Sequence, residues 1–219
     1  IISFACSHDK HADETIDRAL TLLDERPDSA LAILDAIHDS KAAWPEAQRM
    51  RYDLAYAQAQ NKAFVPFTTD SVVLAVADYY NRHGSANERM MARYMVGCAY
   101  RDLGDAPTAL KHLHLAAEAA DTTARDCDLT TLMRIHSQMG GLFQKVAAFE
   151  DQTREYTQAE YLAWQANDTI AALQLMWARS NSMYLQEDYK GAIDILDSIS
   201  SFEQQYNIPE NVEASYPVR

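Results

Sequence analysis

Histidine and carboxylate side chains lie close together in two places where they could ligate a metal ion. His8, Asp9 and His11 fall within four residues near the start of the chain, and imidazole and carboxylate groups both bind divalent metals. A flexible acidic tether, however, yields such pairs by chance. His112 and His114 are two residues apart, so on a helix they point to different faces and cannot share an ion. We therefore expect neither a metal site nor a cofactor.

Catalytic signatures do not accompany these side chains. The sequence lacks the GxSxG, HExxH, P-loop and GxGxxG patterns. Its three cysteines, Cys6, Cys98 and Cys127, are too few and too scattered for a disulfide framework, and no CxxC pair suggests zinc. Whether Cys98 and Cys127 pair stays open. We predict a protein with no catalytic residues, which is not an enzyme.

Charge and composition narrow the class further. The 219 residues include 19 Lys and Arg against 32 Asp and Glu, a formal net charge of −13. This surplus argues against binding nucleic acid, which needs a basic surface, and against docking on anionic lipid. Alanine fills 35 positions, whereas Gly and Pro fill six each. Such a composition favours helices and makes a β-sandwich or barrel improbable, because few turns can be formed.

Apolar residues recur at helical spacing along nearly the whole chain. Ile16, Leu20 and Leu23 share one helix face, and Pro27 separates them from a second set that begins at Leu31. The pattern predicts about ten helices with short connections, which favours antiparallel neighbours. The later helices are expected at about 87–103, 106–120, 126–145, 149–166, 168–186 and 189–205.

One window of the sequence, residues 90–123, has a recognisable repeat pattern. It places small Gly97 and Ala109 where two helices would cross. Gly104 can adopt the left-handed conformation that ends the first helix, and Asp105 can cap the second. In order and in length the window resembles a tetratricopeptide repeat (TPR), whose unit is about 34 residues. The resemblance implies an all-α fold, a right-handed α-α superhelix of about ten antiparallel helices, over residues 11–206.

Weaker copies flank this unit. Gly140 and Tyr156 repeat its order of small and aromatic residues, and Tyr189 with Ala192 matches its second half. Gln152 replaces the small residue expected at one crossing, so we expect that hairpin to splay.

The TPR resemblance also implies a binding groove, because the first helix of each hairpin lines the inner surface in that family. Arg101, Arg134 and Lys145 would form a basic strip able to hold a peptide carboxylate. The same side chains could instead form intramolecular ion pairs or pack neighbouring helices. The groove residues carried over in this way are Tyr94, Arg101, Arg134, Gln144, Lys145, Trp177, Asn181 and Tyr184.

The start of the chain resembles the end of a bacterial lipoprotein signal peptide. Ile1 to Ser7 is an apolar run that contains Ala5-Cys6, and a polar tether follows, so residues 1–10 would hold a lipid anchor at Cys6. An apolar stub packed on the first helix is the alternative. The chain as a whole resembles TPR lipoproteins of Bacteroidetes and the extracytoplasmic TPR regions of signalling proteins, and residues 207–219 form a loop-like tail.

Three functions remain open at this point. The first is an exported, lipid-anchored scaffold in the periplasm or on the outer membrane that binds protein or peptide, as the sensory part of a longer signalling protein in one version. The second is a glycan-binding component of a nutrient-uptake assembly, with Trp44, Trp164 and Trp177 as candidate sugar platforms. The third is a cytoplasmic assembly scaffold. The sequence predicts neither the ligand nor the oligomeric state.

Overall fold

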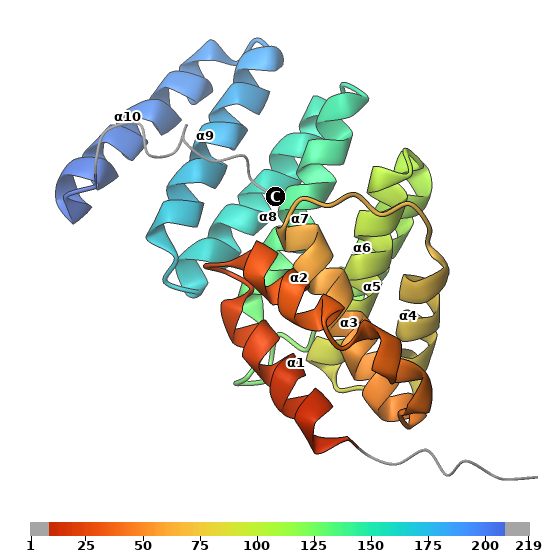
Figure 1. Ribbon diagram of the computed structural model, residues 1–219. Coiled ribbons are helices and arrows are strands. Elements are labelled where there is room, and N and C mark those ends of the chain that lie inside the picture. The colour runs from red at the N-terminus through yellow and green to blue at the C-terminus, as the bar shows by residue number, and fades with distance from the viewer. Residues whose placement is uncertain (1–8, 209–219) are drawn as a thin grey trace, which may run out of the picture. The chain divides into compact units, whose positions relative to one another are not determined.

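The computed structural model describes residues 9–208, of which 79% are helical (Figure 1). Ten α-helices and one 3₁₀-helix occupy this range, which contains no strand, so the predicted all-α class of about ten helices is confirmed. The chain divides into two compact units between Ala109 and Leu110. The helices are α1 (Lys10–Leu22), α2 (Pro27–Asp35), η1 (His38–Ala43), α3 (Glu46–Lys62), α4 (Ser71–His83), α5 (Ala86–Asp102), α6 (Ala106–Ala119), α7 (Leu129–Lys145), α8 (Phe149–Gln165), α9 (Thr169–Leu185) and α10 (Tyr189–Tyr206).

In the first unit, α1, α2 and α3 enclose an apolar core. Trp44 is 2% exposed and meets the ring of Tyr52 edge to face, with 5.5 Å between centroids. The Tyr52 hydroxyl donates to Leu34 O at 3.1 Å, so it accepts from His38 Nδ1, also at 3.1 Å. The core cluster consists of Ala12, Ile16, Ala19, Leu23, Ala30, Leu34, Trp44, Tyr52, Ala55 and Ala59.

Asp9, one of the candidate metal ligands, caps a helix. Its carboxylate accepts from Ala12 N at 3.1 Å, which satisfies a free backbone donor at the start of α1. Its backbone N–H and C=O both bond to the amide of Gln48 on α3. His8 lies outside the described residues. Asp9 therefore serves to anchor α1.

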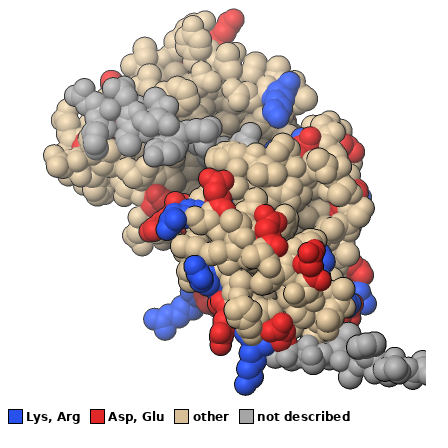
Figure 2. Space-filling view, in the orientation of Figure 1, with Lys and Arg blue, Asp and Glu red and all other residues tan. Residues whose placement is uncertain are grey.

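Ion pairs cover the outer surface of the first unit. Arg51 of α3 reaches Asp13 on α1 at 3.1 Å, and Lys62 of the same helix pairs with Asp24. Figure 2 shows basic and acidic side chains interspersed over the part of this unit that holds α1 to α3. Solvent-exposed pairs of this kind each contribute at most about 1 kcal/mol to stability.

The turn inside the TPR-like window has the predicted geometry. Gly104 has φ +82°, the left-handed conformation that a side chain would strain, and α5 ends just before it. Asp105 then accepts from Thr108 N at 3.1 Å and caps α6. Both predictions for this turn are confirmed.

The second unit has a regular register. Ala147, Asn167, Glu187 and Asn207 each have a positive φ, of 57°, 57°, 65° and 52°, and they are equally spaced in the sequence. After each of them the next backbone N–H bonds to a carbonyl five residues earlier, as in Ala148 N to Phe143 O at 3.0 Å. One turn type therefore recurs at a constant interval along this unit, and two intervals make one helical hairpin.

The crossing of α7 and α8 is close. A Cβ built on Gly140 would lie 2.6 Å from the ring of Tyr156, which is itself 6% exposed. Gln152 is 1% exposed within this hairpin. The expectation that Gln152 splays the hairpin is wrong, because Gly140 supplies the small residue at the crossing and the glutamine is accommodated in the interior.

Polar contacts then join α8 to α9. The hydroxyls of Thr153 and Ser182 are 2.7 Å apart, and Ser182 donates to Phe149 O at 3.0 Å. Glu160 and Arg179 form an ion pair of 3.0 Å. Burial raises the pKa of the Glu160 carboxyl, and Arg179 opposes that shift. These contacts fix which face of α8 receives the following helix.

Candidate interaction surface

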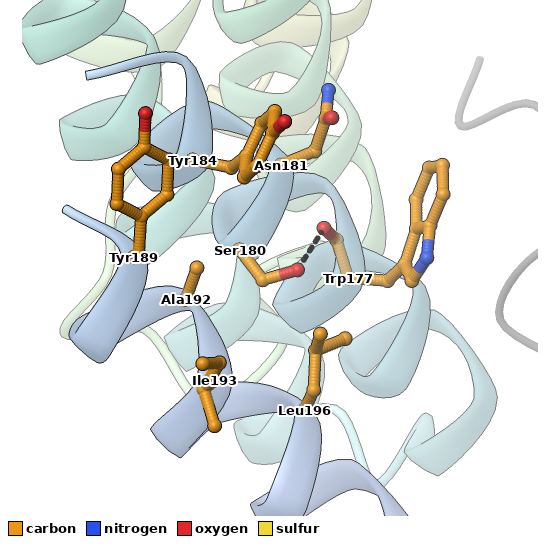
Figure 3. A pocket seen from close by; sticks show the side chains of 8 residues that line it. All are labelled: Trp177, Ser180, Asn181, Tyr184, Tyr189, Ala192, Ile193 and Leu196. Carbon is orange, nitrogen blue, oxygen red and sulfur yellow. Dashed lines mark hydrogen bonds between the residues drawn. The ribbon is translucent and has the colours of Figure 1, made fainter. Parts of the chain in front are cut away.

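Three of the predicted groove residues line one pocket in the second unit. Trp177, Asn181 and Tyr184 lie on α9 and share the pocket with residues of α10 (Figure 3). Its volume is about 310 Å³, at the small end of the range for ligand pockets. The lining consists of Trp177, Ser180, Asn181, Tyr184, Tyr189, Ala192, Ile193 and Leu196. We call this set the α9–α10 surface.

Helical spacing and one turn position these side chains. On each helix the members recur at intervals of three and four residues, so they form a stripe on one face. Glu187, with φ +65°, reverses the chain, and Asp188 caps α10 by accepting from Gly191 N at 3.0 Å. Beneath the surface, Leu173, Met176, Ile195 and Ile199 hold the two helices together.

The stripe is apolar and open to solvent. Tyr184, Tyr189 and Ile193 are 58%, 53% and 56% exposed, and Trp177 and Leu196 are each 41% exposed. The rings of Tyr184 and Tyr189 meet edge to face at 5.4 Å, so each restricts the other. Ser180 donates to Trp177 O at 2.8 Å, which satisfies its hydroxyl within the helix (Figure 3). Large apolar and aromatic side chains exposed together mark interaction sites.

Tyr94 is not a groove residue. It is 3% exposed and sits on α5 among buried side chains, so it offers no aromatic surface to a partner. The residue types are the same in a core and in a groove, and the position within the repeat did not reveal which face of α5 is covered.

Arg101 forms an intramolecular ion pair. Its guanidinium lies 2.8 Å from Asp102 and donates to Asn61 at 3.1 Å, and the side chain is only 11% exposed. Asp102 in turn accepts from Phe67 N at 3.2 Å. Arg101 therefore ties α5 to the last turn of α3, while its partner Asp102 holds the loop that follows α3. This is the intramolecular ion pairing named above as the alternative, so Arg101 is not the peptide-binding arginine that was predicted.

The other basic candidates lie on α7. Gln144 and Lys145 are exposed in its last turn, and Arg134 is half-buried. None of the three belongs to the α9–α10 surface. With Arg101 engaged elsewhere, the predicted strip of three basic residues is wrong as a set.

Tyr189, Ile193 and Leu196 belong to the surface but were missed as site residues. In α10 the buried apolar residues Ala192, Ile195 and Ile199 already account for a core-facing stripe. Tyr189, Ile193 and Leu196 add to this stripe, so the apolar face of α10 is wider than one helix–helix contact can cover. That excess was the signal that could have identified them.

Two of the three candidate sugar platforms are packing residues. Trp44 belongs to the core of the first unit, and Trp164 is half-buried against Phe202, with 5.1 Å between ring centroids. Trp177 alone of the three tryptophans is exposed. The glycan hypothesis therefore loses most of its aromatic surface.

A smaller pocket in the first unit gathers titratable groups. It has a volume of about 140 Å³ and is lined partly by His38, Lys41, Asp53 and Tyr56. Lys41 pairs with Asp53 at 2.7 Å, and the Tyr56 hydroxyl donates to Asp35 at 2.8 Å. Burial and the hydrogen bond to Asp35 raise the pKa of the Tyr56 hydroxyl. His38 bonds to Tyr52, so each of these four side chains has a partner within the first unit.

The structure also bears on the cysteines, on a metal site and on a membrane-spanning helix. Cys98 and Cys127 are not joined by a disulfide, and Cys6 lies outside the described residues. Within residues 9–208, no three potential metal ligands gather, and no helix combines the length and apolarity that a bilayer span requires.

Comparison with known proteins finds similarity in structure only. Neither a protein-family model nor a curated protein sequence matches the chain. A solved structure of TPR-like repeats, from a Podosopora anserina protein described as a kinesin light chain, aligns with a TM-score of 0.65 and 10% identity, covering 90% of this chain and 96% of its own. A single-substitution variant of those repeats gives 0.67 and 10% identity, covering 92% and 100%. The chain therefore has a TPR-like helical-repeat fold.

Proposed function

We propose that this protein is a non-enzymatic scaffold that binds another protein, and that the α9–α10 surface is where it binds. The observation that supports this function is the exposure of Trp177, Tyr184, Tyr189, Ile193 and Leu196 on one face of a helical hairpin. TPR-like folds commonly bind proteins, and repeat arrays as a class bind rather than react.

The chemistry of the surface suits a protein ligand. Trp and Tyr dominate binding energy at protein interfaces because they bury a large area with few rotatable bonds. Asn181, which is half-buried at the edge of the pocket, can add a directional hydrogen bond to a backbone or side chain. A partner that presents apolar side chains would match both features.

Alanine at Tyr184 tests the proposal. Tyr184→Ala is expected to weaken capture of a native partner about tenfold or more, because the ring is a rigid part of the binding surface. The melting temperature should stay nearly unchanged, since the side chain is 58% exposed. Quantitative pull-down from a native extract, followed by binding measurements on each captured protein, provides the readout.

Tyr161→Ala is the matched control. Tyr161 is 56% exposed on α8, outside the α9–α10 surface. A partner lost equally from both variants, or from neither, would place binding elsewhere on the molecule.

Export and lipid anchoring at Cys6 are a second part of the proposal. The support is the lipoprotein-like sequence from Ile1 to Ser7, with the apolar run ending in Ala5-Cys6. In this view the scaffold acts outside the cytoplasm, as a tethered binding protein or as a sensory region. Mass spectrometry of the mature protein is expected to show an N-terminal, lipid-modified Cys6. An unmodified thiol preceded by an intact upstream segment would contradict the anchor and favour a cytoplasmic scaffold.

A further inference from the structure

The α9–α10 surface occupies a repeated position in the second unit. The turns there are equally spaced, so each residue of α8 has a counterpart two intervals later on α10, as Phe149 has in Tyr189. Thr153 lies on the face of α8 that receives α9, because its hydroxyl contacts Ser182. Phe149 and Tyr156 are four residues before it and three after it, so they share this helix face, and Tyr156 also packs on Gly140 of α7. Their counterparts are Tyr189, Ile193 and Leu196.

Burial at these paired positions differs in a consistent way. On α8, Phe149 and Thr153 are half-buried and Tyr156 is 6% exposed. On α10, the three counterparts are 53%, 56% and 41% exposed. The face of α10 also replaces the hydroxyl of Thr153 with the aliphatic side chain of Ile193. The face of α10 that carries Tyr189, Ile193 and Leu196 therefore corresponds to the face of α8 on which α9 packs. At the position of Thr153 it is more apolar than its counterpart on α8.

Charge at the border of this face indicates what kind of helix fits. In residues 187–206, the exposed carboxylates are Glu187, Asp188, Asp194 and Asp197, whereas Lys190 is the exposed base. Asp197 and Asp194 each follow a member of the stripe directly, so on a helix they stand beside it. A docked helix would place its flanks next to these carboxylates and would be attracted if those flanks were basic.

We infer that the α9–α10 surface binds an amphipathic helix with basic flanks, supplied by a partner protein and packed on α10 as α9 packs on α8. This inference rests on the proposed function and adds the class of partner. A second copy of the chain fits poorly, because symmetric packing of α10 on α10 would bring Asp194 and Asp197 against like charges, and each copy carries a net charge of −13.

Synthetic helices test the inference without a known partner. The probes are a peptide about as long as α10, with leucines three and four residues apart and lysines elsewhere, a twin with glutamates for the lysines, and a lysine peptide of the same composition in scrambled order. Fluorescence anisotropy on the full chain should show the basic helix binding about tenfold or more tighter than either other peptide. Added salt should reduce the difference between the two helices.

Variants locate the binding and separate its two components. Leu196→Asp should weaken the basic helix about tenfold or more, while Leu74→Asp should not. Leu74 is the matched control, 37% exposed on α4 against 41% for Leu196. Asp194→Lys combined with Asp197→Lys should reverse the preference, so that the acidic helix binds more tightly.

The remaining outcomes overturn the inference in distinguishable ways. Equal binding of both helices, or tighter binding of the acidic one to the unaltered chain, would refute the basic partner but leave a protein-binding surface. Concentration-dependent dimerisation that Leu196→Asp abolishes would identify a second copy as the occupant. Binding of the basic helix only after deletion of residues 209–219 would identify the chain's own tail. Failure of every peptide, while a native partner still depends on Tyr184, would reject a helical ligand but not the proposed function.

Discussion

Trp44→Ala is expected to lower the free energy of unfolding of the first unit by about 3–5 kcal/mol, as truncation of a large buried aromatic does. Trp44 is 2% exposed, and its indole is one wall of the core that joins α1, α2 and α3. Removing the indole leaves a cavity beside Tyr52, whose hydroxyl is fixed by Leu34 O and His38 and cannot easily move into the space. Urea denaturation followed by circular dichroism measures the loss.

Trp177→Ala is the control for Trp44→Ala, because the indole of Trp177 is 41% exposed. Its effect on stability should stay within about 0.5 kcal/mol, as for most surface substitutions. A Trp44→Ala protein as stable as the unaltered chain would contradict the core assignment. Loss of glycan binding in that stable variant would restore Trp44 as a sugar platform.

The helices and their turns could be predicted because their causes are local. The three-to-four spacing of apolar residues and the capping residues act within a few positions, so the expected range 149–166 differs by one residue from the observed α8 (Phe149–Gln165). Gly104 was identified for the same reason, since a left-handed turn favours glycine wherever the chain needs it.

The groove could be predicted only in part, because exposure depends on which neighbours cover a helix. Tyr94 and Tyr184 were assigned by the same rule, yet one is 3% exposed and the other 58%. The prediction that Arg101 lines the groove was wrong for a related reason, because its partner Asn61 lies far away in the sequence, on another helix. Spacing along one helix could not show either contact.

The repeat register was also hidden from the sequence. Positive φ values at Ala147, Asn167 and Glu187 fall at residues of three different types, none of them glycine, so no common residue marks the turns. A pattern built on the standard TPR length therefore located the single strong window, residues 90–123, and not the interval that recurs along the second unit. The residues Tyr189, Ile193 and Leu196 of α10 can be matched to positions on α8 only once the constant interval between these turns is known.

Gly140 and Gly141 are adjacent in α7 and should respond to alanine in opposite directions. At Gly140 the new methyl would lie 2.6 Å from the Tyr156 ring, which is buried and cannot swing away, so α7 and α8 must separate. Overpacking of this kind costs about 1–3 kcal/mol, and the better helix propensity of alanine offsets up to about 1 kcal/mol of that. At Gly141 a Cβ meets nothing within 4 Å, so Gly141→Ala should stabilise the second unit by up to about 1 kcal/mol. Chemical denaturation of the two variants beside the unaltered chain gives both signs of the stability change in one experiment.

Stabilisation by Gly140→Ala would mean that α7 and α8 do not cross closely at Tyr156. The α7–α8 hairpin would then be no guide to how a helix packs on Tyr189, Ile193 and Leu196 of α10.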